Sequence, residues 1–176
     1  GDCLEKMKDI PDGSIDMILC DLPYGTTACK WDTIIPFEPL WEQYKRIIKD
    51  NGAIVLTASQ PFTSALVMSN IKWFKYEWIW VKNSITGFAN AKKQPLRNYE
   101  DVLVFSKNIT NYYPQGLIRI DKMKKNGQSV GGETLRTNVK NSANKGSLRT
   151  AGKEYIQEFT KYPRQTLFNI KKDTEK

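Results

Sequence analysis

An α/β fold is predicted by three features of this 176-residue chain. Short apolar runs at residues 17–20 and 53–58 have the length and composition of buried strands. Stretches with helical spacing follow both runs, so strand and helix alternate along the first half, as in doubly wound folds. Two further strand patterns, at residues 76–82 and 101–107, are expected to pair as an antiparallel edge. The predicted sheet is therefore mixed.

The first elements are expected to be a short helix and a strand. Leu4 and Met7 stand at helical spacing, and the turn at 11–13 separates them from a strand over residues 14–21. The continuous apolar run of this strand predicts burial on both of its faces. Residues 25–33 show neither the helical nor the strand period, and we expect a loop there.

The next elements complete the predicted core. An amphipathic helix is expected from Pro36 or Pro39 to Asp50, with Asn51-Gly52 as its C-terminal stop. The strand at 53–58 and a helix from residue 62 to about 70 follow. Three tryptophans at strand spacing are more often core than a stacking platform, and we expect them in the core: Trp73, Trp78 and Trp80.

The periodic pattern fades after Ser106. Residues 108–150 combine several glycines with Asn, Ser, Lys and Arg, a composition that suits a loop-rich region following a charged backbone. One short helix is expected over residues 152–162. The predicted organisation is an α/β core over residues 1–107, a basic loop-rich region over 108–168 and a charged tail over 169–176.

The positive charge is concentrated in the second half. The chain carries a net charge of +8, yet residues 1–106 contain 12 Lys and Arg against 13 Asp and Glu. Residues 107–176 contain 15 against 6. This distribution favours a neutral body with an attached phosphate-binding surface, and therefore a nucleic acid as partner. A solvated lysine-rich tail is the alternative reading.

Composition also excludes several classes of protein. The chain has no histidine, which removes Ser-His-Asp and Cys-His triads and HExxH zinc sites. The three cysteines match no metal-binding spacing, so no metal is expected. No stretch has the length of a membrane span, and the first residues lack the pattern of a signal peptide. We expect a cytoplasmic protein that does not bind membranes.

The candidate catalytic stretch is Asp21-Leu22-Pro23-Tyr24, which directly follows the first apolar run. Open α/β sheets bind ligands at the carboxyl ends of their strands. An exocyclic amino group of a nucleobase needs two hydrogen-bond acceptors to become nucleophilic, and Asp21 with the Leu22 carbonyl would supply them. Pro23 restricts the Leu22 backbone to extended conformations. Tyr24 would replace the stacking that a base loses when it leaves the duplex, worth about 1–3 kcal/mol. An ordinary turn after a strand is the competing reading.

These four residues resemble the DPPY motif of the amino-group DNA methyltransferases, which use S-adenosylmethionine. In order along the chain, other stretches are similar to further motifs of that family: residues 1–4, 51–57 with 60–62, 76–80 and 97–107. The resemblance implies a Rossmann-like methyltransferase fold. It also implies that Asp2 contacts the adenosyl part of the cofactor, in a site with Cys3, Asp21 and Pro23.

The order of the motifs is similar to that of the permuted β class, in which the glycine-rich cofactor loop follows the catalytic half. No such loop is found after residue 107, so the catalytic half is expected to be present and the glycine-loop half absent. Leu22 stands where the family usually has Pro. The acceptor is a backbone oxygen, so we expect its geometry to survive.

The resemblance implies methyl transfer to adenine N6 in double-stranded DNA, because Asp at the first motif position is more typical of adenine enzymes. Cytosine N4 and a non-catalytic DNA-binding fragment are the alternatives. The region over residues 108–168 would recognise the target, and a homodimer is compatible with the family. The cations expected to contact DNA are Lys92, Lys93, Arg97, Lys122, Lys124, Lys125, Arg136, Lys140 and Arg149.

Overall fold

The computed structural model describes residues 2–125 and 154–168, which form two compact units. One unit contains the described residues up to Tyr112 together with the segment that begins at Arg164, and the other runs from Tyr113 to Pro163. The first unit contains a five-stranded sheet with the strand order β1-β2-β4-β3-β7. No helix in the described part of the chain is long and apolar enough to cross a membrane.

The sheet is mixed, as predicted. Strands β1 (Ile15–Asp21) and β2 (Ile48–Ala58) are parallel, and β4 (Arg97–Phe105) is antiparallel both to β2 and to β3 (Phe74–Thr86). The short β7 (Thr166–Leu167) pairs in parallel with β3. Therefore β1, β2 and β3 run in one direction, and the expected antiparallel pairing of the last two strong strand patterns is confirmed.

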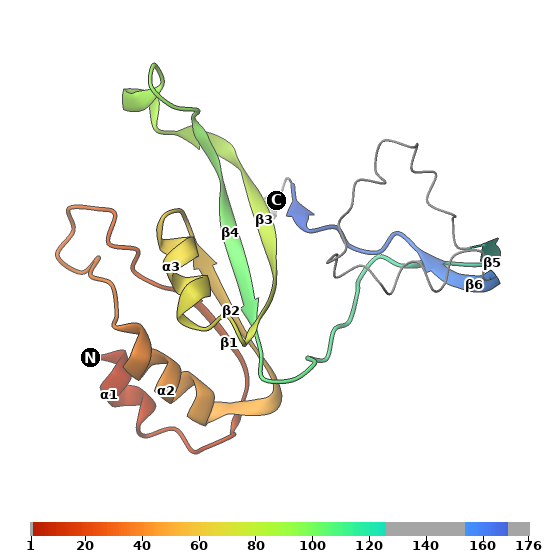
Figure 1. Ribbon diagram of the computed structural model, residues 1–176, viewed down its shortest axis with the longest axis horizontal. Coiled ribbons are helices and arrows are strands. Elements are labelled where there is room, and N and C mark those ends of the chain that lie inside the picture. The colour runs from red at the N-terminus through yellow and green to blue at the C-terminus, as the bar shows by residue number, and fades with distance from the viewer. Residues whose placement is uncertain (1, 126–153, 169–176) are drawn as a thin grey trace, which may run out of the picture. The chain divides into compact units, whose positions relative to one another are not determined.

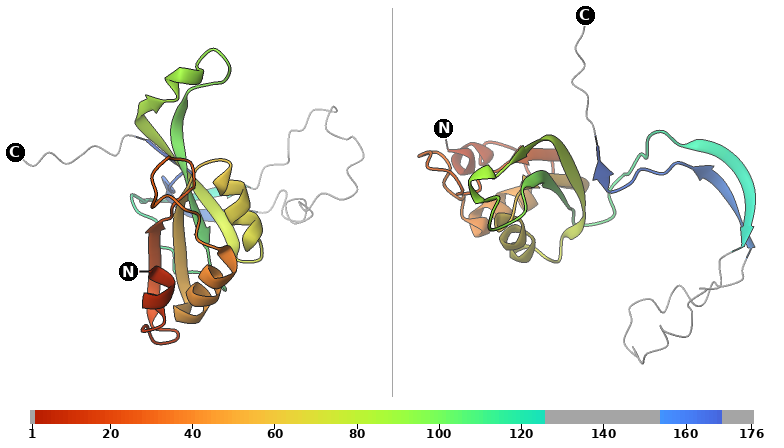
Figure 2. Two further views of the ribbon diagram at one scale, coloured as in Figure 1. Left: turned by 90° about the vertical axis from the view of Figure 1, so that its left-hand side faces the viewer. Right: turned by 90° about the horizontal axis from the view of Figure 1, so that it is seen from above.

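Three helices accompany these strands: α1 (Cys3–Met7), α2 (Phe37–Ile47) and α3 (Phe62–Ser69). Helices α2 and α3 lie on the same face of the sheet (Figure 2). The apolar side of α2 and alternate residues of β2 and β4 form the core there, and buried residues that share this cluster are Leu40, Trp41, Tyr44, Ile47, Ile54, Leu56, Phe62, Leu66, Leu103 and Phe105. The spacing of these apolar residues along α2 is what predicted the helix.

The other face of the sheet, which we call the open face, differs from the prediction. Alternate residues of β1 point to it, and Met17 and Leu19 are 57% and 66% exposed. The expectation that β1 is buried on both faces is therefore wrong. A continuous apolar run gives no information about which of its faces is covered. Trp78 and Trp80 are only partly buried, so the expectation of a core position is also wrong for them.

Helix α2 ends earlier than predicted. It stops at Ile47, and Ile48 already pairs with Ile15 of β1 as a strand neighbour. Gly52, expected as a helix stop, lies inside β2, where a Cβ atom would stand 2.8 Å from the Asp16 carbonyl oxygen and 2.7 Å from the Ile48 side chain. Gly52 is therefore needed for close strand approach rather than for ending a helix.

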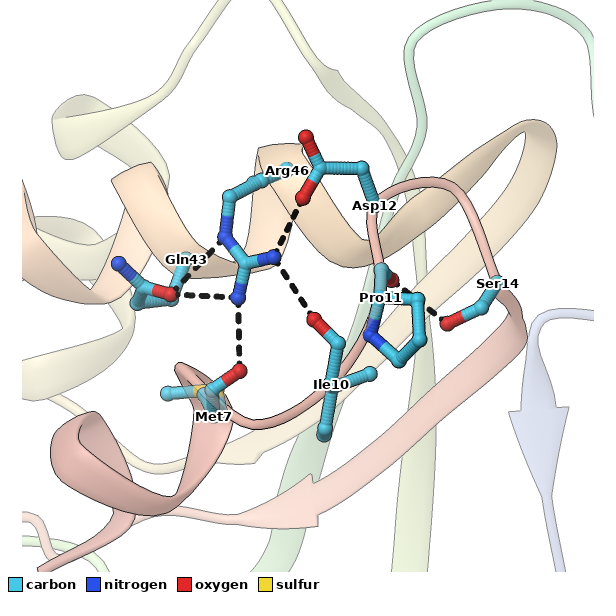
Figure 3. A network of polar contacts seen from close by, with 7 residues as sticks. All are labelled: Met7, Ile10, Pro11, Asp12, Ser14, Gln43 and Arg46. Atoms are coloured by element: carbon cyan, nitrogen blue, oxygen red, sulfur yellow. Dashed lines mark hydrogen bonds and ion pairs between the residues drawn. The ribbon is translucent and has the colours of Figure 1, made fainter.

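Arg46 joins the end of α2 to the turn before β1 (Figure 3). Its guanidinium donates to the backbone carbonyls of Met7 and Ile10, both at 2.7 Å, and also contacts the carboxylate of Asp12 and the amide oxygen of Gln43. A planar group with five N–H donors can satisfy several carbonyls at once. This network fixes where β1 enters the sheet.

The β3–β4 hairpin extends beyond the other strands (Figure 1). Ala58, the last residue of β2, pairs with Asp101 of β4, which in turn pairs with Ile79 of β3. Residues 80–100 therefore lie past the carboxyl ends of β1 and β2, and they include a 3-10 turn, η1 (Phe88–Asn90).

The second unit contains an antiparallel ribbon formed by β5 (Ile118–Lys125) and β6 (Glu154–Thr160). The short helix expected over residues 152–162 is wrong for the described part of that range, which forms β6 instead. Its sequence has helix-compatible residues, but pairing with β5 satisfies its backbone hydrogen bonds in an extended conformation.

Candidate active site

The motif carboxylate lies at the carboxyl end of a parallel strand, as predicted. Asp21 is the last residue of β1, and it stands beside Thr57 of β2 in the strand register. Both side chains project to the open face, because Cys20 and Leu56 next to them point toward the helices. Asp21 is exposed to solvent. The corner is therefore accessible to a ligand.

Three oxygen atoms meet at this corner. The Tyr24 hydroxyl lies 2.8 Å from Asp21 Oδ1 and 2.8 Å from Thr57 Oγ1. The Thr57 hydroxyl donates to the same Asp21 Oδ1. Two hydroxyl groups thus converge on one carboxylate oxygen, whereas Asp21 Oδ2 takes no hydrogen bond from the described residues. The carboxylate is held in one orientation with its second oxygen available as an acceptor.

The Tyr24 ring is placed by the core. It stacks on Phe62, at the start of α3, with ring centroids 5.2 Å apart and an angle of 28° between the planes. Burial raises the pKa of Tyr24 well above its ordinary value, and the nearby Asp21 carboxylate adds to this effect. The phenol therefore remains a hydrogen-bond donor at neutral pH. One face of the ring is covered by Phe62.

The loop that follows the motif is closed by Asp32. This carboxylate accepts the backbone N–H groups of Gly25, Thr26 and Thr27 at 2.8, 2.9 and 2.7 Å. Asp32 is only 8% exposed. Hydrogen bonds from the Thr27 side chain and from these amides lower the pKa of Asp32 to about 2. Gly25 has φ +67°, a conformation that glycine adopts without strain. The backbone directly after Tyr24 is therefore tied down.

The remaining motif residues have distinct environments. Leu22 is 5% exposed and belongs to the core, so its side chain anchors the backbone between Asp21 and Pro23. At the start of the chain, Asp2 caps α1 by accepting the Leu4 N–H at 2.8 Å. Cys3 is an exposed free thiol in the same helix. The expected contacts of Asp2 and Cys3 with a cofactor stay predictions.

The cations expected to contact DNA fall in two places. Lys92, Lys93 and Arg97 are exposed on the β3–β4 hairpin, past the edge that carries Asp21. At the base of this hairpin, Lys82 pairs with Glu100. The other three described cations lie on β5 of the second unit: Lys122, Lys124 and Lys125. The remaining three lie outside the described residues: Arg136, Lys140 and Arg149.

Sequence reasoning missed three residues of this corner: Thr57, Phe62 and Asp32. A signal existed for Thr57, since parallel strands bring their carboxyl ends together and Thr57 stands near the end of the second apolar run. Thr57 and Phe62 both lie in stretches that are similar to family motifs, but neither was assigned a role in the site. No pattern in the sequence distinguishes Asp32 from an ordinary loop acid, because its three partners depend on the path of the backbone.

The family of the chain follows from comparison with known proteins. Residues 15–172 match the family model of the DNA methylases named N6_N4_Mtase. The chain therefore belongs to the DNA methylase family. Its α/β fold and the exposed motif carboxylate at the end of β1 agree with this assignment. The resemblance to amino-group DNA methyltransferases is confirmed at this level.

One curated relative is the type II methyltransferase M.HinfI of Haemophilus influenzae. It is 29% identical over 119 residues, which cover 52% of this chain and 33% of the relative. The chain thus spans about a third of the length of the relative it matches.

Two solved structures that are similar to this chain have lower sequence identity to it than this relative has. The complex of M1.HpyAVI with SAM has a TM-score of 0.48 and 21% identity, covering 66% of this chain and 60% of that one. The cytosine-N4-specific PvuII DNA methyltransferase has a TM-score of 0.47 and 14% identity, covering 62% and 48%.

Proposed function

We propose that this chain transfers a methyl group from S-adenosylmethionine to the exocyclic N6 of adenine in double-stranded DNA. The observation that carries the proposal is the hydrogen bonding of the Asp21 carboxylate. Its Oδ1 accepts from Tyr24 and Thr57, while Oδ2 is left for a further donor. An amino group supplies such a donor. Membership of the DNA methylase family supports the same conclusion.

The chemistry assigned to the corner is hydrogen-bond acceptance at the amine. Asp21 Oδ2 accepts one N–H and the Leu22 carbonyl accepts the other, which turns the nitrogen lone pair out of the ring plane and toward the methyl group. The amine held in this way would accept the methyl group that bound S-adenosylmethionine supplies, and the electron pair of the broken C–S bond would remain on sulfur. The proton that the amine loses passes to Asp21 Oδ2 or to water. Most of the acceleration comes from positioning.

Tyr24 is proposed to hold the base after it leaves the duplex. Because Phe62 covers one face of the Tyr24 ring, the base would stack on the opposite face. The hydroxyl contacts with Asp21 and Thr57 keep the ring from turning away.

The residues present fit one end of the cofactor. Asp21 brings an exposed negative charge, and Leu19, two residues earlier on the same face of β1, exposes an apolar surface. A sulfonium cation with an adenosyl group requires both kinds of surface. When bound, S-adenosylmethionine supplies a methyl group that is already activated by the positive sulfur. Asp21 and Pro23 would hold it here, and Asp2 with Cys3 is proposed for its adenosyl part.

The choice of adenine over cytosine rests on Asp21, since the resemblance associates Asp at this position with N6 enzymes. Base specificity is tested by incubating the protein with unmethylated genomic DNA and labelled S-adenosylmethionine. The DNA is digested to nucleosides, and mass spectrometry then separates N6-methyladenine from N4-methylcytosine. N6-methyladenine is expected, and N4-methylcytosine alone would overturn the base assignment.

The role of Asp21 is tested in the same assay with Asp21→Asn. Because the amide presents an N–H group or a weaker acceptor to the amine, transfer should fall at least 100-fold while DNA affinity is retained. Asp9→Asn, an exposed acid before β1, serves as the matched control and should keep full activity. Equal activity of the two variants would overturn the assignment of Asp21.

Absence of transfer by the wild-type chain, together with salt-dependent DNA binding, would instead support a DNA-binding role without catalysis. This outcome would leave the family unchanged, because the family rests on the sequence match over residues 15–172.

A further inference from the structure

Helix α3 is held by a side-chain hydrogen bond near each of its ends. Near its start, the Thr63 hydroxyl donates to Asp101 Oδ2 of β4 at 2.6 Å. Near its end, Trp41 of α2 donates its indole N–H to the Ser69 hydroxyl at 2.7 Å. The two bonds fasten the same helix to different elements, and the first of them joins it to the sheet.

The bond near the start of α3 is buried. Thr63 and Asp101 are 4% and 6% exposed, and Asp101 shares the helix-covered face of β4 with Leu103 and Phe105. Burying a carboxylate is costly unless a donor meets it. A hydrogen bond to a charged oxygen is strong and requires a narrow range of distance and angle. The pair therefore fixes the position of the start of α3 more closely than apolar contacts alone do.

This bond connects Asp101 to the candidate active site. Phe62, the residue before Thr63, is buried, and its ring stacks on Tyr24 with centroids 5.2 Å apart. The Tyr24 hydroxyl in turn lies 2.8 Å from Asp21 Oδ1. A series of direct contacts therefore leads from Asp101, through the first residues of α3, to the motif carboxylate.

The backbone of Asp101 reaches the same carboxylate by a second route. Asp101 pairs with Ala58 in the register of β4 and β2. Ala58 follows Thr57, whose hydroxyl donates to Asp21 Oδ1. The two hydroxyl groups that contact this oxygen, those of Tyr24 and Thr57, are therefore both placed by elements that meet at Asp101.

We infer that Thr63 and Asp101 are positioning residues for the proposed methyl transfer, an inference that rests on the proposed function. Their hydrogen bond seats Phe62 and so keeps the Tyr24 ring at the angle from which its hydroxyl reaches Asp21. The second oxygen of the Asp21 carboxylate then stays directed at the amine. Thr63 and Asp101 act from the helix-covered face, through Phe62 and Tyr24, without contact with the base.

Ser69 provides a matched control on the same helix. Thr63→Val removes the hydroxyl near the start of α3 and keeps the branched shape, whereas Thr63→Ser keeps the donor. Ser69→Ala removes the acceptor of the Trp41 indole near the other end. Thr63→Val and Ser69→Ala each take a hydrogen bond from α3, so a loss of stability is expected in both. An effect on the active site is expected in Thr63→Val alone.

The double variant Thr63→Val/Asp101→Leu separates positioning from stability. Replacing both partners of a buried hydrogen bond by apolar groups of similar shape is far less destabilising than leaving one partner alone. This variant should therefore remain folded, as checked by circular dichroism, while it lacks the directed bond.

The first readout needs neither DNA nor cofactor. In NMR spectra of the full chain with ¹³C-labelled tyrosine and aspartate, the Tyr24 ring signals and the Asp21 carboxyl signal should shift in Thr63→Val and in the double variant. Both should keep their wild-type positions in Thr63→Ser and Ser69→Ala. The second readout is kcat for methyl transfer to double-stranded DNA. It should fall about 10-fold in the two variants without the bond and stay near the wild-type value in the other two.

The outcomes distinguish this inference from the proposed function. If the Tyr24 and Asp21 signals keep their wild-type positions in both variants without the bond, the inference is overturned. Equal losses of kcat in Thr63→Val and Ser69→Ala would also overturn it, because α3 would then act through stability alone. Failure of the proposed function has a different result: the wild type transfers no methyl group, while the Tyr24 and Asp21 signals still respond to loss of the Thr63 hydroxyl. That result would support the positioning of Tyr24 and Asp21 by the buried pair.

Discussion

Thr57 shows at the scale of one residue how the fold completes the motif. Its hydroxyl contacts both Asp21 and Tyr24, although 36 residues separate it from Asp21. A lone Asp side chain at a strand end can rotate freely. Such rotation would make the position of the amine in the proposed transfer less exact and so slow the reaction. With two hydroxyl donors on Oδ1, rotation is restricted and Oδ2 keeps its direction. Thr57 is therefore expected to be a positioning residue.

The first prediction is made for Thr57→Val, which keeps the branched shape and removes the hydroxyl. Loss of a hydrogen bond to a charged group costs about 1.5–3 kcal/mol, so kcat for methyl transfer should fall about 10- to 100-fold with KM for DNA nearly unchanged. Thr57→Ser retains the donor and should restore most of the activity.

A second readout does not depend on activity. The ¹³C chemical shift of the Asp21 carboxyl should change in Thr57→Val and stay close to wild type in Thr57→Ser. Identical shifts in both variants would contradict a contact between Thr57 and Asp21 in solution.

At the scale of an element, the loop over residues 25–32 likewise depends on the contacts of one side chain, that of Asp32. Without Asp32, three consecutive backbone N–H groups would have no partner among the described residues, and the segment after Tyr24 would lose three contacts that fix its backbone. The charge of Asp32 is therefore tied to the order of this loop.

The second prediction concerns pH. The hydrogen bonds lower the pKa of Asp32 from 3.8 to about 2, so its contribution to stability is fully present above about pH 4. That contribution is lost as the pH falls through about 2, when the carboxylate is protonated. The amide proton signals of Gly25 and Thr27 should shift with a midpoint near pH 2 in NMR spectra of the wild type.

The comparison for this titration is Asp32→Asn, in which the low-pH shift of the two amide signals should disappear. Asp9→Asn should retain it. A wild-type midpoint near pH 3.8 would mean that the three N–H contacts do not persist in solution.

The open face is the main feature at the scale of the whole first unit. Strand β1 stands at the end of the described sheet order, and Met17 and Leu19 leave much of their apolar surface in water. Exposed apolar residues on an edge strand promote association between chains. A homodimer stays a prediction, and this face is where we would expect one to form.

The third prediction tests this exposure with Met17→Lys. A charge on the open face should oppose contact between apolar surfaces, so the variant should show less concentration-dependent association in sedimentation velocity. Ile71→Lys is the matched control, because Ile71 is 54% exposed after α3 rather than on the sheet. If both variants associate as the wild type does, the open face is not responsible for self-association.

Some helices and strands could be predicted from the sequence and others could not, for a physical reason. Apolar periodicity predicted α2, β1 and the core of β2, because these patterns are local and repeat along the chain. The end of α2 and the strand character of β6 were missed, since each depends on pairing with a distant strand, β1 and β5 respectively. Propensity over a few residues is weak against such pairing.

The sequence by itself determined the α/β class, the family motif at residues 21–24 and the basic character of the second half. All three follow from the local order of the residues, from their composition or from their spacing. Only the tertiary structure decided that Thr57 and Tyr24 hold Asp21, that Asp32 closes the loop and that Thr63 ties the start of α3 to Asp101. These contacts join residues by strand register and backbone path, which no local pattern encodes.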